Sequence, residues 1–400
     1  MTPDVVVVGG GCAGSAAAYF LAKAGVRVTL LEKERLAAGS SGHSTGISRV
    51  MLRDLDATDH ADLNSRAIPR LEKVVPLLED LTGFDVQYQP APGMTIPLTE
   101  DAWTQLRASA PTAGHVILSG DAARELEPCL GPDVLGAAWE PLRRKLDSQL
   151  LTRTYARAAE LNGAEITIGE LVGIRLDGAG VTAVDTSVGT IPCGAVVLAM
   201  GVDAPKAGAW LGVDIPIIPI KGEALRLHHS GPRGNHLLTP LGLRPGFVEA
   251  GHIAFRRDGL VSVGSTIEDT GYDSRPTEAA RDRIMRMACH LVPALESAEV
   301  AEHVYGLRPV PADGLPILGE VPGVRGAYLI AAHSVCATSA MLAEITTDLI
   351  TRGTTDAVAS VEPFSLTRFA GRRLADIEVF GIVRHMRDAR PTIDAAYPTR

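Results

Sequence analysis

The N-terminal part of the chain alternates short apolar runs with one alanine-rich stretch. Residues 5–8 are four consecutive valines, which predicts a strand buried on both faces. Residues 15–24 are rich in alanine and stop at Gly25, which indicates a helix. The apolar run 26–31 then predicts a second strand. The pattern therefore predicts a β-α-β unit.

A glycine motif joins the first strand to the helix. The segment GGGCAG at residues 9–14 has the spacing GxGxxG, in which Gly9 makes the tight turn and Gly11 lets the backbone approach a pyrophosphate. Gly14 lets the helix pack closely on the strand. Glu32 ends the second strand and can accept hydrogen bonds from both ribose hydroxyls of an adenosine. Together these parts predict a dinucleotide site, disfavour NADP, and leave NAD and FAD open.

Further along the chain the pattern changes. Residues 224–228 and 260–265 alternate apolar and polar positions, which predicts antiparallel strands, and residues 276–291 form the pattern of an amphipathic helix. A mixed arginine and aspartate run at 368–390 predicts a solvent-exposed helix in the tail. Lys221 lies in what we interpret as a linker, where it would position a loop.

Composition narrows the class of protein. The chain has 400 residues, of which 46% are hydrophobic and 21% charged, so we expect a globular protein that needs no disulfides. A formal net charge of −9 and 4% aromatic residues argue against a nucleic-acid binder. The five cysteines form no CxxC pair, which predicts a reduced, cytoplasmic protein without a metal site. No run approaches the ~20 apolar residues of a membrane span, and the N-terminus lacks the features of a signal peptide.

Several segments resemble a known family in their order along the chain. They are the Gly- and Ser-rich loop 38–47, the strand-like segment 170–174, the segment GAVVLAMG at 194–201, the segment PIKGE at 219–223 and the segment YGLRPVPADGLPILG at 305–319. From residue 3 to about residue 353 the chain resembles the D-amino acid oxidase-like family of FAD-dependent oxidoreductases, which includes glycine oxidase, sarcosine oxidase and dimethylglycine dehydrogenase. The resemblance implies that the dinucleotide is FAD.

The resemblance also implies a fold. We expect an α/β protein in which a Rossmann-type FAD-binding domain is interleaved with an α+β substrate domain built on an antiparallel sheet. The FAD-binding domain is expected at residues 1–85, 145–215 and 303–353, the substrate domain at 86–144 and 216–302, and a C-terminal helical extension at 354–400.

Many positions correspond to residues that hold FAD in the family. They surround the pyrophosphate turn, the ribose acid, the loop that wraps the flavin, the strand that faces the adenine, and a helix start whose N–H groups stabilise negative charge on the reduced flavin. The expected cofactor-binding residues are Gly9, Gly11, Cys12, Ala13, Gly14, Glu32, Lys33, Ser40, Ser41, His43, Ser44, Thr45, Gly46, Val172, Gly201, His333, Ser334, Val335, Cys336, Ala337 and Thr338. Ala332 stands where the family usually has glycine, so the backbone there is expected to pass the flavin differently.

The segment GLRP carries the expected substrate contact. Arg308 matches the arginine that pairs with the substrate carboxylate in the glycine oxidase branch, and a guanidinium fork suits that task. The alternative is that Arg308 has a structural role, in which it anchors a loop or pairs with a buried carboxylate of the protein. Tyr305 is a second catalytic candidate because it precedes this segment and could reach the substrate. A purely structural role in the core is an equally open interpretation of Tyr305. His252 and Arg256 are candidate substrate-binding residues on an expected strand, although a strand histidine is more often structural.

His43 is a catalytic and cofactor-binding candidate with two open interpretations. In dimethylglycine dehydrogenase-like enzymes the matching histidine is bonded covalently to the flavin, whereas other members carry a histidine that only donates a hydrogen bond, which we favour. The cysteine that tethers FAD in monomeric sarcosine oxidases has no counterpart at residues 306–307. The oxygen-activating lysine of those enzymes has none at residues 261–262. Oxidase and dehydrogenase activities therefore both stay open.

The resemblance implies FAD-dependent oxidation of a carbon–nitrogen bond in a small carboxylate-bearing amine or amino acid, by hydride transfer to flavin N5, to give an imine that hydrolyses. One alternative is an FAD-dependent 2-hydroxy acid dehydrogenase. Another is a non-catalytic flavin-binding subunit or an RNA-modifying flavoprotein, and the acidic charge counts against RNA. The expected partners are the amine and molecular oxygen or another electron acceptor, with no nucleic acid and no transmembrane segment. The expected state is a monomer or homodimer in the cytoplasm.

Overall fold

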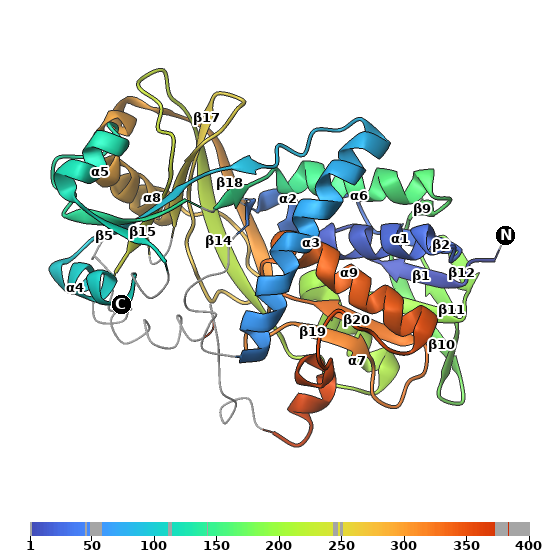
Figure 1. The fold of residues 1–400 in the computed structure, drawn as a ribbon. Helices are drawn as coiled ribbons and strands as arrows, with labels where there is room; N and C mark the ends of the chain where they lie inside the picture. The colour runs from blue at the N-terminus through green and yellow to red at the C-terminus, as the bar shows by residue number, and fades with distance from the viewer. Residues whose placement is uncertain are drawn as a thin grey trace. The chain divides into compact units, whose positions relative to one another are not determined.

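The computed structural model describes residues 2–44, 46–48, 58–110, 114–141, 143–242, 247–248, 251–372 and 383. The chain forms two compact units, each assembled from separate pieces of sequence (Figure 1). Unit 1 comprises Met1–Tyr88, Leu146–Pro219 and Arg308–Arg384, and unit 2 comprises Gln89–Lys145, Ile220–Leu307 and His385–Arg400. The chain therefore passes between the units several times.

Unit 1 is built around a six-stranded sheet with the strand order β19-β20-β13-β1-β2-β9. Its central strand β1 (Val5–Val8) pairs in parallel with β13 (Ala195–Leu198) and with β2 (Val28–Glu32). Beyond these lie β9 (Glu165–Ile168), β20 (Ala327–Ala331) and the antiparallel β19 (Ile317–Glu320). The valines of β1 face two different apolar cores in alternation. The strand is thus buried on both faces, which confirms the prediction from its composition.

Helices and a small sheet cover the two faces of this central sheet. On one face pack α1 (Cys12–Lys23), α3 (Thr58–Thr82), α6 (Ser148–Leu161) and α9 (Val335–Arg352), which share a core with alternate valines of β1 (Figure 1). The buried alanines of α1 let α6 and α9 approach it closely. The other face carries β10 (Leu171–Asp177), β11 (Gly180–Thr186), β12 (Gly189–Pro192) and α7 (Ala204–Leu211).

Unit 2 contains most of an eight-stranded sheet with the order β18-β14-β17-β16-β15-β5-β7-β6. Its strands are β5 (Gly93–Pro97), β6 (Val116–Ser119), β7 (Gly136–Glu140), β14 (Ile217–His228), β15 (Leu237–Leu241), β16 (His252–Phe255), β17 (Leu260–Gly264) and β18 (Glu299–Pro311). Ala224 pairs with Gly264 and His228 with Leu260, so the two predicted alternating runs are neighbouring antiparallel strands.

The helices of unit 2 are α4 (Glu100–Ser109), α5 (Gly120–Leu126) and α8 (Glu278–Leu291). The predicted amphipathic helix is α8, which begins after Thr277 because that hydroxyl accepts the backbone N–H of Ala280. Lys221 lies inside β14 and is only 3% exposed, so its interpretation as a linker residue is wrong.

Short elements complete the chain. They are α2 (Ser40–His43), β3 (Ile47–Ser48), β4 (Gln89–Pro90), β8 (Arg144–Lys145), and the 3-10 helices η3 (Gly201–Asp203), η4 (Pro293–Ser297), η5 (Glu362–Phe364) and η6 (Leu366–Phe369). Within the described ranges no helix is both long enough and apolar enough to cross a lipid bilayer.

The described part of the tail differs from the prediction of a solvent-exposed helix. Arg368 lies in η6 and is largely buried, with Nε 2.6 Å from Asp313 Oδ2 and Nη2 3.0 Å from Asp313 Oδ1. Its Nη2 also donates to the carbonyl of Leu315 at 2.9 Å. The prediction is therefore wrong at its start, because a buried carboxylate holds this arginine. Most of the expected helical extension, from residue 373 onward, lies outside the described residues.

Removing one partner of this buried pair should destabilise the fold. Arg368→Ala leaves the carboxylate of Asp313 buried without a cation, and we expect a loss of about 3–5 kcal/mol in the free energy of unfolding, measured by urea denaturation. The control is Arg175→Ala, which removes an exposed ion pair with Asp185 in the same unit and should leave that free energy almost unchanged. Equal effects of the two substitutions would show that Asp313 is solvated.

Candidate functional site

The glycine turn after β1 brings the start of α1 against the sheet. Gly9 has a φ of +109°, and a Cβ there would lie 2.4 Å from the carbonyl oxygen of Ala199. A Cβ on Gly14 would lie 1.9 Å from the carbonyl oxygen of Gly9. Gly11 is the N-cap of the helix and has no side chain to accept the helix's N–H groups, of which the first, on Cys12, is accepted by Ser41 Oγ. The first turn of α1 therefore presents backbone N–H groups, as an anion-binding helix start does.

The predicted flavin loop contacts this helix start. Ser41 of α2 accepts the backbone N–H of Cys12 at 2.9 Å, which joins two segments that the sequence pattern treated separately. His43 ends α2 with its Nδ1 3.1 Å from the carbonyl of Gly39. Ser44 follows, and its carbonyl accepts the hydroxyl of Ser148 at 3.1 Å. Thr45, also expected in this group, lies outside the described residues.

The adenosine end of the predicted site is formed by the ends of β2 and β9. Glu32 is buried, and its Oε2 accepts the backbone N–H of Gly10 at 2.6 Å. Glu32, the last residue of β2, pairs with Ile168, the last residue of β9. The chain that follows β9 therefore leaves the sheet at the same edge as Glu32. Val172 lies in that following chain, and its apolar side chain is 53% exposed.

Lys33 is held by an acid from the turn after β13. Its Nζ lies 2.9 Å from Asp203 Oδ2, and this hydrogen bond raises the pKa of Lys33 above its usual value. Asp203 belongs to η3, which begins at the predicted cofactor residue Gly201, with a φ of +57°. The structure thus brings Lys33 and the Gly201 turn together at one edge of the sheet.

The start of α9 is a second open helix N-terminus. Ser334 precedes the helix with a φ of +61°, a left-handed conformation that strains any residue other than glycine. Ser334 Oγ lies 3.2 Å from His333 Nδ1, and no described side chain caps the helix.

Two predicted cofactor-binding cysteines meet between these helices. Cys12 at the start of α1 and Cys336 at the start of α9 are both buried, and their thiols interact with each other. The thiol of Cys336 and burial raise the pKa of Cys12 well above its usual value, so Cys12 is a neutral thiol. The sequence offered no sign of this pairing, because spacing rules such as CxxC detect only close neighbours in the chain.

The predicted substrate residues lie in different parts of the chain. Arg308 is partly buried on β18, within unit 1, whereas Tyr305 of the same strand belongs to unit 2 and is 42% exposed. Nearby, both oxygens of the motif's acid, Asp313, accept from Arg368. Sequence reasoning missed Arg368, because it lies outside the segments that resemble the family.

His252 and Arg256 lie at opposite ends of one β-hairpin in unit 2. His252 is buried and pairs with Gly264, whereas Arg256 is in the turn, where its Nε lies 2.9 Å from Asp258 Oδ2. At ~3.3 Å per residue they are ~13 Å apart along the strand. The structure therefore does not bring them together around one small molecule. Among the described residues no cluster of His, Cys, Asp and Glu is suited to a metal ion.

The fold and the arrangement of this site define the class of protein. A β-α-β unit with a glycine turn, a buried acid at the end of the second strand and an open helix start is a dinucleotide-binding α/β domain. The chain matches the family described as FAD dependent oxidoreductase (DAO) over residues 4–349, and it belongs to that family.

Known proteins of similar sequence and structure agree with this assignment. Glycine oxidase of Geobacillus kaustophilus is 29% identical over 380 residues, covering 92% of this chain and 98% of that protein. The bifunctional protein ThiO/ThiG of Trichormus variabilis is 31% identical over 327 residues, covering 80% of this chain and 48% of that protein, so the alignment spans about half of its length. The crystal structure of glycine oxidase from Geobacillus kaustophilus superimposes with a TM-score of 0.83 at 28% identity, covering 92% of this chain and 98% of that one.

The residues present in unit 1 fit FAD. Glu32 is a buried carboxylate that keeps acceptor capacity for ribose hydroxyls. A Cβ atom on Gly9 or Gly14 would collide with backbone atoms, so both positions of the turn require glycine. The N–H groups that follow Cys12 at the start of α1 suit the pyrophosphate, and the uncapped start of α9 suits the negatively charged edge of the reduced flavin.

The strain at Ser334 can be tested directly. Ser334→Gly removes the steric conflict of the positive φ, and we expect the free energy of unfolding to stay equal or to rise by up to about 1 kcal/mol. Ser334→Val adds a branched side chain in the same conformation and should lower it by about 1–3 kcal/mol. The measurement is thermal or urea unfolding of the holoprotein. If Ser334→Gly proved the more damaging change, the left-handed conformation would be contradicted.

Proposed function

We propose that this FAD-dependent oxidoreductase oxidises a carbon–nitrogen bond in a small amine or amino acid that carries a carboxylate, giving an imine that hydrolyses. The observation that carries this proposal is the place of Arg308, which is partly buried on β18 within the GLRP segment of a chain that belongs to this family. The guanidinium of Arg308 is proposed to bind the carboxylate of the substrate through two parallel hydrogen bonds, the geometry in which arginine recognises a carboxylate. The relatedness to glycine oxidase supports the same chemistry.

We assign unit 1 to FAD binding and the sheet of unit 2 to the substrate domain. In unit 1 the start of α1 binds the pyrophosphate, Glu32 binds the ribose, and the segment that begins at His333 faces the flavin ring. FAD, when bound, supplies the hydride acceptor for the substrate carbon. The protein's task is then to hold the substrate by its carboxylate and to orient the carbon.

We propose that the cofactor is held without a covalent bond. His43 Nδ1 lies 3.1 Å from the carbonyl of Gly39, so the imidazole is tied to its own short helix as a hydrogen-bonding group. Acid precipitation of the holoprotein tests this: the yellow colour should stay in the supernatant. Colour in the pellet that disappears in the His43→Ala variant would establish a covalent link instead.

The proposal extends to the location, the electron acceptor and the assembly state of the protein. We propose a cytoplasmic protein, in which Cys12 and Cys336 are buried as reduced thiols. The electron acceptor is molecular oxygen or another oxidant, and the assembly is a monomer or a homodimer.

The role of Arg308 predicts a specific kinetic result. Arg308→Ala should lower kcat/KM for a carboxylate-bearing amine by an amount equivalent to about 2–5 kcal/mol, because the substrate carboxylate loses its partner. Arg308→Lys keeps the charge but loses the planar fork, and should fall between the wild type and the alanine variant. Steady-state kinetics measure both. An unchanged kcat/KM in Arg308→Ala would contradict the proposed grip on the carboxylate.

A further inference from the structure

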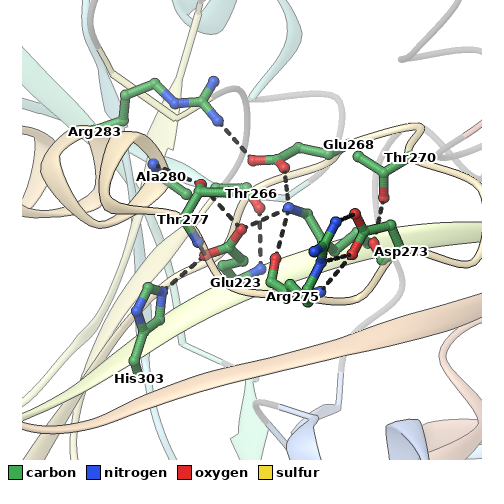
Figure 2. Close-up of polar contacts among 11 residues, drawn as sticks. Glu223, Thr266, Glu268, Thr270, Asp273, Arg275, Thr277, Ala280, Arg283 and His303 are labelled. Atoms are coloured by element: carbon green, nitrogen blue, oxygen red, sulfur yellow. Dashed lines mark hydrogen bonds and ion pairs between the residues drawn. The ribbon is translucent and has the colours of Figure 1, made fainter.

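A cluster of charged side chains is buried in unit 2 around Glu223, as Figure 2 shows. Glu223 is 0% exposed and Lys221, on the same strand β14, is 3% exposed. Lys221 Nζ lies 2.8 Å from Glu223 Oε1 and 2.8 Å from Glu268 Oε2. Arg283 of α8 lies 2.7 Å from the other oxygen of Glu268. The two glutamates and the two cations therefore balance each other.

The carboxylate of Glu223 is held by groups from different elements. Its Oε2 accepts the backbone N–H of Thr277 at 3.0 Å, and its Oε1 accepts the Thr277 hydroxyl at 3.3 Å. His303 of β18 approaches from the other side, with Nε2 2.8 Å from Oε2 (Figure 2). The backbone of Glu223 is bonded in both directions to Thr266, with its N–H donating to Oγ1 and its carbonyl accepting the N–H, each at 3.0 Å. Glu223 thus joins β14 to β18 and to the start of α8.

A contribution to the stability of the fold does not by itself explain why these charged side chains are buried together. Taking charges out of water costs more than burying apolar groups of the same volume, and buried ion pairs often contribute nothing net. A fully hydrogen-bonded polar network does fix its members in one arrangement. The arrangement of Glu223 and His303 is therefore better explained by the strand that it holds in place.

The strand held by this cluster is the one that carries Arg308. β18 is an edge strand whose neighbour in the eight-stranded sheet is β14. In the described part of the chain two side-chain contacts between charged or titratable groups join these strands, the exposed ion pair Arg226–Glu302 at 2.5 Å and the buried contact of Glu223 Oε2 with His303 Nε2 at 2.8 Å. His303 is the later of the two along β18, which then leaves unit 2 after residue 307 and continues at once into Arg308.

We propose that Glu223 is a positioning residue for the substrate carboxylate, because through His303 it fixes the strand on which Arg308 lies. This inference rests on the proposed function of Arg308. An error of about 1 Å in the placement of an orienting group can reduce the rate by about 10²-fold, so a small displacement of an edge strand is enough to matter. Glu223 touches neither substrate nor cofactor in this role.

The test is the affinity of the holoenzyme for a simple carboxylic acid, measured by isothermal titration calorimetry with acetate and propionate as probes. Glu223→Gln keeps the shape of the side chain but removes its charge, and should raise Kd about tenfold or more. Glu302→Gln makes the same chemical change in the exposed pair between the same two strands, and should raise Kd less than twofold. Equal Kd values for the two variants would overturn the proposal.

A double-substitution series separates positioning from general damage. In an Arg308→Ala background, Glu223→Gln should change Kd less than twofold further, because it acts through Arg308. Thr277→Val removes the hydroxyl that contacts Glu223 and caps α8, so it should lower Tm without changing Kd. If Glu223→Gln does not fold, His303→Gln removes the same pair from the β18 side and should raise Kd in the same direction. Independent, additive effects of Glu223→Gln and Arg308→Ala would overturn the positioning role.

The variants distinguish the proposed role of Arg308 from the proposed role of Glu223. If Arg308→Ala itself leaves Kd unchanged, the proposed grip on the carboxylate and the positioning role are both wrong. If Arg308→Ala weakens binding but Glu223→Gln behaves like Glu302→Gln, only the positioning role is wrong.

Discussion

The cofactor site depends on one close backbone contact, between the start of α1 and the turn at Gly9. A side chain on Gly14 would lie 1.9 Å from the carbonyl oxygen of Gly9, and a side chain on Gly9 would lie 2.4 Å from that of Ala199. Only bare backbone fits between these segments, so the helix start reaches the carboxyl ends of the parallel strands. Ser41, Glu32 and the start of α9 are then arranged around this helix start. The position of every group proposed to hold FAD depends on it.

Much of unit 1 could be predicted because its signals are local. Four adjacent valines specify a strand buried on both faces, and the glycine spacing specifies the turn that follows. The same holds in unit 2 for the hairpin of β14 with β17 and for the start of α8, where Thr277 is an ordinary helix cap. In each case the residues that decide the structure lie within a few positions of one another.

The features that the sequence did not reveal join residues far apart in the chain. Arg368 and Asp313 are separated by 55 positions, and neither hydrophobic periodicity nor a motif indicates that they meet. The contact of Cys12 with Cys336 and the burial of Lys221 among glutamates have the same origin. A basic residue in a mixed run is normally solvated, and only the presence of a buried partner changes that. Pairing of this kind is a property of the folded chain.

The net charge of the whole protein and the local charge of the proposed site have opposite effects on an anionic substrate. A formal net charge of −9 repels an anionic substrate at a distance, although salt screens this repulsion beyond ~8–10 Å. Recognition of a carboxylate must therefore come from a fixed local cation, which we place at Arg308. The measurement that tests this most directly is anaerobic flavin reduction of the holoenzyme by matched compounds. We predict that a small α-amino acid bleaches the flavin, whereas its decarboxylated amine and the corresponding 2-hydroxy acid do so far more slowly. Equal bleaching by the decarboxylated amine, or bleaching by the 2-hydroxy acid alone, would contradict the proposed function.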